Sequence, residues 1–250
     1  MISIKSKDEI EKLKKSAAIL AEVKQELKTL VRPGATGLEL DAYAEKRIRQ
    51  LGGTPSFKGY MGFQHTLCIS LNEDLIHGIP NNKKFKDGDI VKIDMGAVYK
   101  GYHSDSAFTI GLGTISKQDK KVIEVAEQSF YKGIDAIKPG ARIGDIGHAI
   151  GSFVDSKGLY VPDDFTGHGI GSSLHEEPYI PNYGNPGTGP LLRDGMVICI
   201  EPMIMQDTEE VVILEDGWTV RSLSGKNTSH YEQTILIENG YPVILTEKED

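Results

Sequence analysis

The chain has 250 residues, of which 39% are hydrophobic and 26% are charged, and its formal net charge is −8. This composition is typical of a globular protein, and the length suits one large domain or two small ones. Acidic residues are in excess and basic residues do not cluster, which argues against a nucleic-acid substrate.

The cysteines and the N-terminal segment indicate the cellular compartment. Cys68 and Cys199 lie in apolar, strand-like segments, which is typical of buried thiols and not of a disulfide framework. The first fifteen residues, MISIKSKDEIEKLKK, lack the apolar core of a secretion signal. No apolar run approaches the roughly 18 residues of a membrane span. We therefore expect a soluble, cytoplasmic protein without a membrane partner.

The first part of the chain predicts two helices followed by three strands. Ser6 and Glu9 have the spacing of a capping box, and the long amphipathic helix that follows them ends near residues 32–34. A second helix runs from Leu38 to about Leu51, where two glycines end it. Strands are predicted at Thr66–Leu71, Asp89–Val98 and Tyr102–Ile110.

The same order of elements then begins again. Ser116 can cap a helix that runs to about Ile137, and a further helix runs from about Gly144 to Ser156. Strands are predicted at Met196–Glu201, Val211–Leu214, Thr219–Leu223, His230–Glu238 and Pro242–Leu245.

Two pairs of similar segments indicate an internal duplication. PGATGLEL begins at Pro33 and PGARIGDI at Pro139, while DGDIVKID begins at Asp87 and DGMVICIE at Asp194. From the Pro to the Asp-Gly pair is 54 positions in the first half (87 − 33) and 55 in the second (194 − 139). We therefore expect one catalytic domain, residues 1–250, of two related α+β halves, 1–113 and 114–250. The halves would pack around a pseudo-two-fold axis, and sites often form at such a junction.

Two acids lie on a predicted hairpin that should be buried. A two-residue turn at Lys100-Gly101 sets Asp94 opposite Ala107 and diagonal to Asp105. The two carboxylates then share one face, with Cβ atoms about 7 Å apart. Ionised acids this close in an apolar setting repel each other and lose hydration. They need protonation, a basic partner or a metal ion.

Two further acids strengthen the metal interpretation. Glu201 is equivalent to Asp94, because each follows an Asp-Gly pair by the same number of positions, and Glu232 lies in the apolar segment SHYEQTILIE. The alternative is that Lys92 or Lys100 neutralises the acids, or that an acid faces water. Four acids in four strand contexts exceed the basic residues of those strands, so the sequence favours metal.

Histidines are the remaining ligand candidates. His168 lies between two glycines, which permit close backbone approach, and we expect it to be the fifth ligand. His230 is two positions from the last of the acids and stays a candidate. His148 falls within a predicted helix, where it should face solvent or packing, while His65 and His103 have no distinctive context.

Four carboxylates and one imidazole suit a pair of divalent ions about 3.5–4 Å apart. Mn, Fe or Co fit this mixed oxygen and nitrogen set, Zn is an alternative, and the ligand spacing is not that of a calcium loop. Such ions activate water and polarise a carbonyl. His77 and His175 are candidates for proton transfer and oxyanion stabilisation. The sequence lacks a phosphate cradle, so we predict a two-metal hydrolase of a peptide bond.

Five segments of the sequence resemble, in order, motifs of the type I methionine aminopeptidases: CISLNEDLIHGIP, KIDMGAVYKGYHSDSA, TGHGIGSSLHEEP, CIEPM and YEQTILI. The resemblance covers essentially the whole chain. It implies the pita-bread α/β fold, in which helices cover antiparallel sheets. It also implies removal of the N-terminal methionine of nascent proteins and peptides, with a small second residue preferred. We expect a monomer that contacts the ribosome transiently.

The resemblance also implies roles for individual residues. Glu201 would exchange protons with the attacking water, His77 would contact substrate near the scissile amide, and His175 would stabilise the tetrahedral intermediate. The metal ligands would be Asp94, Asp105, His168, Glu201 and Glu232, with Asp105 and Glu232 bridging. The methionine pocket would consist of Tyr60, Phe63, Cys68 and Trp218, for which core packing is the alternative.

Two rival interpretations remain open. The first is another pita-bread hydrolase, such as a proline-specific dipeptidase or aminopeptidase P, which rates on Met-Ala-Ser and Xaa-Pro peptides would separate. The second is a non-catalytic binding protein with the same fold, for example one that docks at the ribosome. Relatives of that kind tend to lose ligands, whereas all five are present here.

Overall fold

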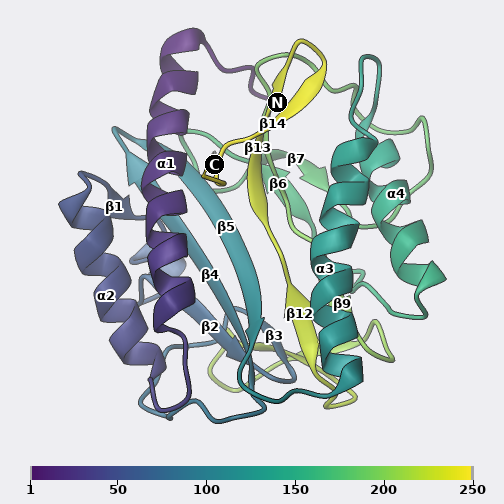
Figure 1. Ribbon diagram of the computed structural model, residues 1–250. Helices are drawn as coiled ribbons and strands as arrows, with labels where there is room; N and C mark the ends of the chain where they lie inside the picture. The colour runs from purple at the N-terminus through teal and green to yellow at the C-terminus, as the bar shows by residue number, and fades with distance from the viewer. Residues whose placement is uncertain (1, 249–250) are drawn as a thin grey trace.

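The computed structural model describes residues 2–248. Two pairs of helices enclose the strands: α1 (Lys7–Leu30) and α2 (Gly37–Gln50) lie on one side, and α3 (Lys117–Asp135) and α4 (Ile143–Ser156) lie on the other (Figure 1). All four correspond to predicted helices, with ends close to those expected from the sequence.

The predicted helix starts are confirmed by their caps. The Ser6 hydroxyl accepts a hydrogen bond from the Glu9 amide, and the Glu9 carboxylate accepts one from the Ser6 amide at 2.7 Å. The Ser116 hydroxyl accepts from the Asp119 amide at 3.0 Å. Such caps satisfy amides that have no partner within the helix, so they specify where each helix begins.

The first sheet is antiparallel and is packed against α1 and α2. Its strands are β1 (Thr54–Pro55), β2 (Leu67–Leu71), β4 (Ile90–Tyr99) and β5 (Tyr102–Gly111), with β4 paired to the other three. Apolar side chains from both layers fill the space between helices and sheet, among them Leu20, Leu27, Ile48, Val91 and Ile93.

The register of the β4–β5 hairpin is the predicted one. Lys100 and Gly101 form the turn with φ of 48° and 81°, as a tight hairpin turn requires. Asp94 pairs with Ala107, so Asp105 lies diagonally from Asp94 on the same face of the sheet.

The second half repeats this arrangement with α3, α4 and a five-stranded sheet. The sheet order is β14-β13-β8-β6-β7, all antiparallel, and its core includes Phe130, Ile146, Ile150, Ile198 and Ile235. Its strands are β6 (Gly167–Gly169), β7 (Glu176–Ile180), β8 (Val197–Ile200), β13 (Gln233–Glu238) and β14 (Tyr241–Ile244). The predicted duplicated α/β architecture is therefore confirmed.

Short elements complete the fold and link the halves. Strand β3 of the first half pairs with β11 of the second, β10 pairs with β11, and β9 pairs with β12. These elements are β3 (Asp74–Ile76), β9 (Met203–Met205), β10 (Val211–Ile213), β11 (Val220–Ser222), β12 (Thr228–His230) and the 3₁₀ turn η1 (Tyr60–Gly62). The sequence does not predict strands β1, β3, β6, β7 and β9, since two to five residues carry little periodic signal.

The prediction of one strand from the sequence is wrong. Residues 230–238 do not form a single strand, because β12 ends at His230 and β13 begins at Gln233. Between them, Glu232 leaves both ladders and forms an isolated antiparallel bridge with Ala107 of β5. The Glu232 amide donates to the Ala107 carbonyl at 3.0 Å, and the Ala107 amide donates in return at 3.2 Å. This bridge joins the two halves beside the acids.

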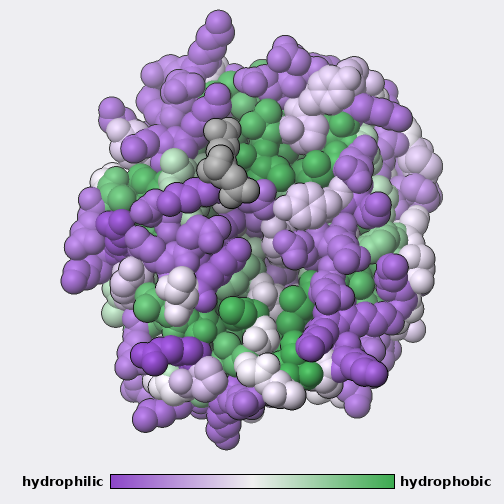
Figure 2. Space-filling model, viewed as in Figure 1, coloured by the Kyte–Doolittle hydropathy of each residue, from purple (hydrophilic) through white to green (hydrophobic). Residues whose placement is uncertain are grey.

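The visible surface is mainly hydrophilic (Figure 2), in agreement with the 26% of charged residues in the sequence. In the view of Figure 2, hydrophilic side chains cover most of the molecule and apolar ones appear in small separate groups. Both cysteines are buried and unpaired, as predicted. Among the helices of residues 2–248, none has the length and apolar character needed to cross a bilayer.

Candidate metal centre

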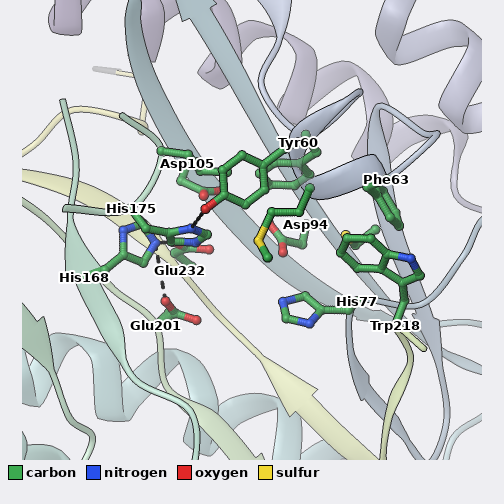
Figure 3. Close-up of a pocket in the computed structure, with 14 residues that line it drawn as sticks. Tyr60, Phe63, His77, Asp94, Asp105, His168, His175, Glu201, Trp218 and Glu232 are labelled. Atoms are coloured by element: carbon green, nitrogen blue, oxygen red, sulfur yellow. Dashed lines mark hydrogen bonds and ion pairs between the residues drawn. The ribbon is translucent and has the colours of Figure 1, made fainter. Parts of the chain in front are cut away.

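One pocket of about 190 Å³ is lined by every residue proposed for the site from the sequence. Figure 3 shows the acids and the imidazoles of His168 and His175 towards one end, and Phe63 and Trp218 at the other, with His77 between them. The full lining is Phe57, Tyr60, Met61, Phe63, Cys68, His77, Asp94, Asp105, His168, Leu174, His175, Glu201, Trp218 and Glu232.

The four acids come from both halves of the fold. Asp94 and Asp105 lie on β4 and β5, Glu201 directly follows β8, and Glu232 lies at the bridge to β5. The Thr234 hydroxyl fixes this junction, because it donates to the Asp105 carbonyl at 2.8 Å and accepts from the Asp105 amide at 3.0 Å. The sheets therefore meet where their acids face one another.

The glycines beside His168 have a steric reason. A Cβ atom on Gly167 would lie 2.3 Å from the Cys199 carbonyl oxygen, and one on Gly169 would lie 2.3 Å from the Glu177 carbonyl oxygen. His168 Nδ1 is 2.9 Å from the Gly169 carbonyl oxygen, which assigns the proton to Nδ1. The Nε2 lone pair then faces the acids, 3.6 Å from Glu201 Oε1 and 4.0 Å from Glu232 Oε1.

Several buried polar atoms of the site have no hydrogen-bond partner within the described residues: Asp94 Oδ1, Asp105 Oδ1, Glu232 Oε1 and both ring nitrogens of His230. Orphaned atoms of this kind are rare in folded proteins and call for an ion or water. The donor set of carboxylate oxygens and imidazole nitrogen fits a divalent metal ion of the Mn, Fe, Co or Zn type.

The structure argues against a lysine partner for these acids. Lys92 is buried, but its ammonium donates to the carbonyls of Asn72 and Thr228, at 2.7 and 3.2 Å, and not to an acid. Lys100 is exposed at the hairpin turn, with its ammonium 5.5 Å from the centre of the Tyr99 ring. The salt-bridge alternative is therefore wrong, which leaves protonation or metal.

Burial is the main cause of the raised pKa values of the four acids. It raises the pKa of Asp94 to about 6. Burial, and next the neighbouring carboxylates, raise the pKa values of Asp105, Glu201 and Glu232 well above their usual range. The cause is the loss of hydration by four acids in one pocket, which a bound cation would offset.

Burial moves the histidines in the opposite direction. It lowers the pKa of His168 to about 3 and the pKa values of His77 and His230 to about 4. These imidazoles are therefore neutral near pH 7. A neutral imidazole can bind metal through one ring nitrogen and donate a hydrogen bond from the other.

The protonated acids should make the metal-free protein lose stability as the pH rises from about 6.5 to about 7. Its raised-pKa acids hold protons that the unfolded chain has released, and the free energy of unfolding falls with pH wherever the folded state binds more protons. The buried histidines oppose this trend below about pH 6.5, where the unfolded chain gains protons that they do not. Lys24 and Lys92, whose pKa values burial lowers to about 7, oppose it above about pH 7, where the unfolded chain keeps protons that they lose.

Bound metal replaces the protons of the acids. Saturating Mn²⁺ should therefore raise the Tm, and this gain should be larger at the higher pH, because fewer protons must then leave the acids. Thermal unfolding with chelator and with Mn²⁺ at the two pH values measures both effects. Equal slopes in the two conditions would contradict this account.

The apolar end of the pocket is formed by side chains that also pack on one another. The Phe63 and Trp218 rings lie edge to face with centroids 5.0 Å apart, and Cys68 is buried beside them in the same cluster. Tyr60 lies nearer the acids, where its hydroxyl is 2.8 Å from His175 Nδ1. Phe63 and Cys68 thus line the pocket and also pack within this cluster.

Some lining residues are not identified by the sequence. Phe57 and Met61 line the pocket, and Met61 is 81% exposed in the 3₁₀ turn η1. No spacing or motif distinguishes them. His230, which the sequence leaves as a candidate, lies against Glu201 and Glu232.

The other three histidines lie apart from the pocket lining, as expected. His148 is exposed on α4. His65 Nδ1 is 3.3 Å from Asp41, and His103 Nδ1 is 2.7 Å from the Ser56 hydroxyl.

A cluster of buried acids and imidazole, set where two halves of a duplicated α/β fold meet, defines a metal-dependent hydrolase. The model of metallopeptidase family M24 matches residues 11–239. The chain belongs to this family.

The chain is similar over its full length to methionine aminopeptidases. It is 46% identical over 245 residues to methionine aminopeptidase 1 of Bacillus subtilis, covering 98% of this chain and 99% of the relative. The crystal structure of methionine aminopeptidase from Thermotoga maritima has a TM-score of 0.97 and 42% identity, covering 99% and 100% of the two chains. The resemblance to methionine aminopeptidases and the pita-bread fold are therefore confirmed.

A more distant similarity concerns the rival interpretation. The prolidase from Pyrococcus furiosus has a TM-score of 0.81 and 26% identity, and the match covers 99% of this chain but 66% of the prolidase chain. This chain and the prolidase share the fold. In sequence identity and in length, however, this chain agrees better with the methionine aminopeptidases.

Proposed function

We propose that this protein is a methionine aminopeptidase, which removes the N-terminal methionine of nascent proteins and peptides and prefers a small second residue. The observation that carries the proposal is a pocket with acids and imidazole at one end and the aromatic side chains of Phe63 and Trp218 at the other. The full-length similarity to methionine aminopeptidases supports the same substrate.

The proposed metal ligands are Asp94, Asp105, His168, Glu201 and Glu232, with Asp105 and Glu232 bridging. Their support is the shared pocket, the unpartnered oxygens and the Nε2 atom of His168 that faces two acids. Two divalent ions bound there, Co, Mn, Fe or Zn, would polarise the scissile carbonyl and lower the pKa of the attacking water.

Glu201 is the proposed proton carrier. Its side chain is 12% exposed, against 3% for Glu232, so it is the more accessible of the two to water and substrate. It accepts a proton as water oxygen adds to the carbonyl carbon. It then returns that proton to the amine as the carbon–nitrogen bond breaks, which balances the hydrolysis.

Two histidines outside the ligand set contact the substrate in this proposal. The Tyr60 hydroxyl lies 2.8 Å from His175 Nδ1. With this hydroxyl as the donor, the His175 proton is on Nε2, from which it is donated to the oxygen of the tetrahedral intermediate. His77 lies between the acids and the aromatic end, where it can donate to the substrate beside the scissile amide.

The methionine side chain would pack among Tyr60, Phe63, Cys68 and Trp218. Aromatic rings make favourable contacts with a thioether sulfur, and the edge-to-face pair of Phe63 and Trp218 offers both a ring face and a ring edge. An apolar pocket that accommodates sulfur would select the unbranched side chain of methionine.

The setting of the enzyme is proposed on more general grounds. We propose one catalytic domain, active as a monomer in the cytoplasm and in transient contact with the ribosome, where N-terminal methionines emerge. The predominantly hydrophilic face in Figure 2 supports a monomer. A chain with net charge −8 is not expected to bind nucleic acid as substrate.

Metal-dependent release of methionine from Met-Xaa-Ser peptides tests the proposed function. With Mn²⁺ or Co²⁺, we expect kcat/KM for Met-Ala-Ser to exceed that for Met-Leu-Ser by roughly 10–200-fold, the scale on which pockets discriminate by size. Faster cleavage of Xaa-Pro peptides would favour a prolidase. No release with either metal would favour a binding protein.

A further inference from the structure

His230 is a buried histidine for which the proposed reaction has no role. It is the last residue of β12 and is 2% exposed. Neither ring nitrogen has a hydrogen-bond partner within residues 2–248. Burying an imidazole without a hydrogen-bond partner costs free energy of folding, which indicates that the groups around it give it a function.

Those neighbours are two of the proposed metal ligands. His230 Nε2 is 3.6 Å from Glu201 Oε2 and 3.9 Å from Glu232 Oε2. His168 Nε2 stands at similar distances, 3.6 and 4.0 Å, from the Oε1 atoms of the same acids. The two imidazoles thus face opposite oxygens of one carboxylate pair.

The backbone of His230 is held firmly in this place. Its amide donates to the Thr109 hydroxyl at 3.0 Å, and that hydroxyl donates to the His230 carbonyl at 2.7 Å. On the other side, His230 pairs with Met203 in the β9–β12 ladder. The strand therefore aims the imidazole at the carboxylates.

From this geometry, and resting on the proposed function, we infer that His230 is a positioning residue for the metal centre. Its Nε2–H, 3.6 Å from Glu201 Oε2, would donate to that oxygen once the carboxylate binds metal, and would so leave Oε1 free for the ion. Both ring nitrogens of His230 are unpartnered among the described residues, so its Nε2–H is available to this oxygen. Carboxylates that bind metal are commonly oriented by such donors.

A matched pair of variants tests the inference. Gln and Met are unbranched and similar in size, but only Gln carries an N–H donor. His230→Gln should keep the affinity for Mn²⁺ within about threefold of the unmodified protein, whereas His230→Met should lower it by about 10–100-fold. Calorimetric titration of the metal-free proteins with Mn²⁺ alone measures this, and circular dichroism checks the fold.

Each remaining outcome overturns the inference. If His230→Met binds Mn²⁺ like the unmodified protein, His230 does not position the ligands. If both variants lose affinity equally, the imidazole is needed itself, as a direct ligand. His230→Ala replaces the Met variant if that variant does not fold. Because the titration contains no peptide, failure of the unmodified protein to release methionine would count against the proposed function and not against this inference.

Discussion

Asp105→Asn should abolish methionine release, with kcat/KM lowered by at least about 10³-fold, as for the loss of one member of a catalytic unit. In the proposed centre Asp105 bridges the ions, and a neutral amide cannot replace a bridging carboxylate. Its backbone contacts to Thr234 should survive, since they do not involve the side chain of Asp105. The fold should therefore persist.

The stability of the same variant gives an independent readout. Burial of Asp105 among carboxylates raises its pKa well above the usual range, so ionising it costs stability in the metal-free protein. The metal-free Asn variant should unfold at an equal or higher temperature, while the Tm gain on adding Mn²⁺ should shrink. Glu124→Gln, at an exposed acid of α3, is the control and should change neither quantity. Near-normal activity of Asp105→Asn would refute the bridging assignment.

His175→Ala should lower kcat by about 10²–10³-fold, on the scale of removing one oxyanion donor. KM should change much less, because the contact strengthens as charge develops on the carbonyl oxygen. Since His175 lies at an exposed position, the Tm should stay close to that of the unmodified protein. Steady-state kinetics on Met-Ala-Ser separate the two parameters.

Tyr60→Phe is the matched test of the hydrogen bond that orients His175. It keeps the ring and the imidazole but removes the hydroxyl that lies 2.8 Å from Nδ1. We expect a loss of kcat smaller than that of His175→Ala, because the oxyanion donor remains and only its orientation is relaxed. An unchanged kcat in His175→Ala would exclude His175 from oxyanion stabilisation.

Features that depend on near neighbours in the chain can be predicted from the sequence. The caps at Ser6 and Ser116 act within one helical turn, and the turn at Lys100-Gly101 imposes the register that puts Asp94 beside Asp105. The internal repeat by itself relates Asp94 to Glu201, because it is visible in the order of the residues. Finer roles, such as those of the pocket residues, come from the resemblance to a family.

What the sequence alone determined is therefore local: the helices, the hairpin and the presence of acids in apolar strands. Only the tertiary structure showed that Glu232 leaves its strand to bond with Ala107, and that His230 and Met61 lie at the site. The physical reason is that these positions depend on how the two cores of the fold pack together. That packing sets distances between residues far apart in the chain, on which local periodicity carries no information.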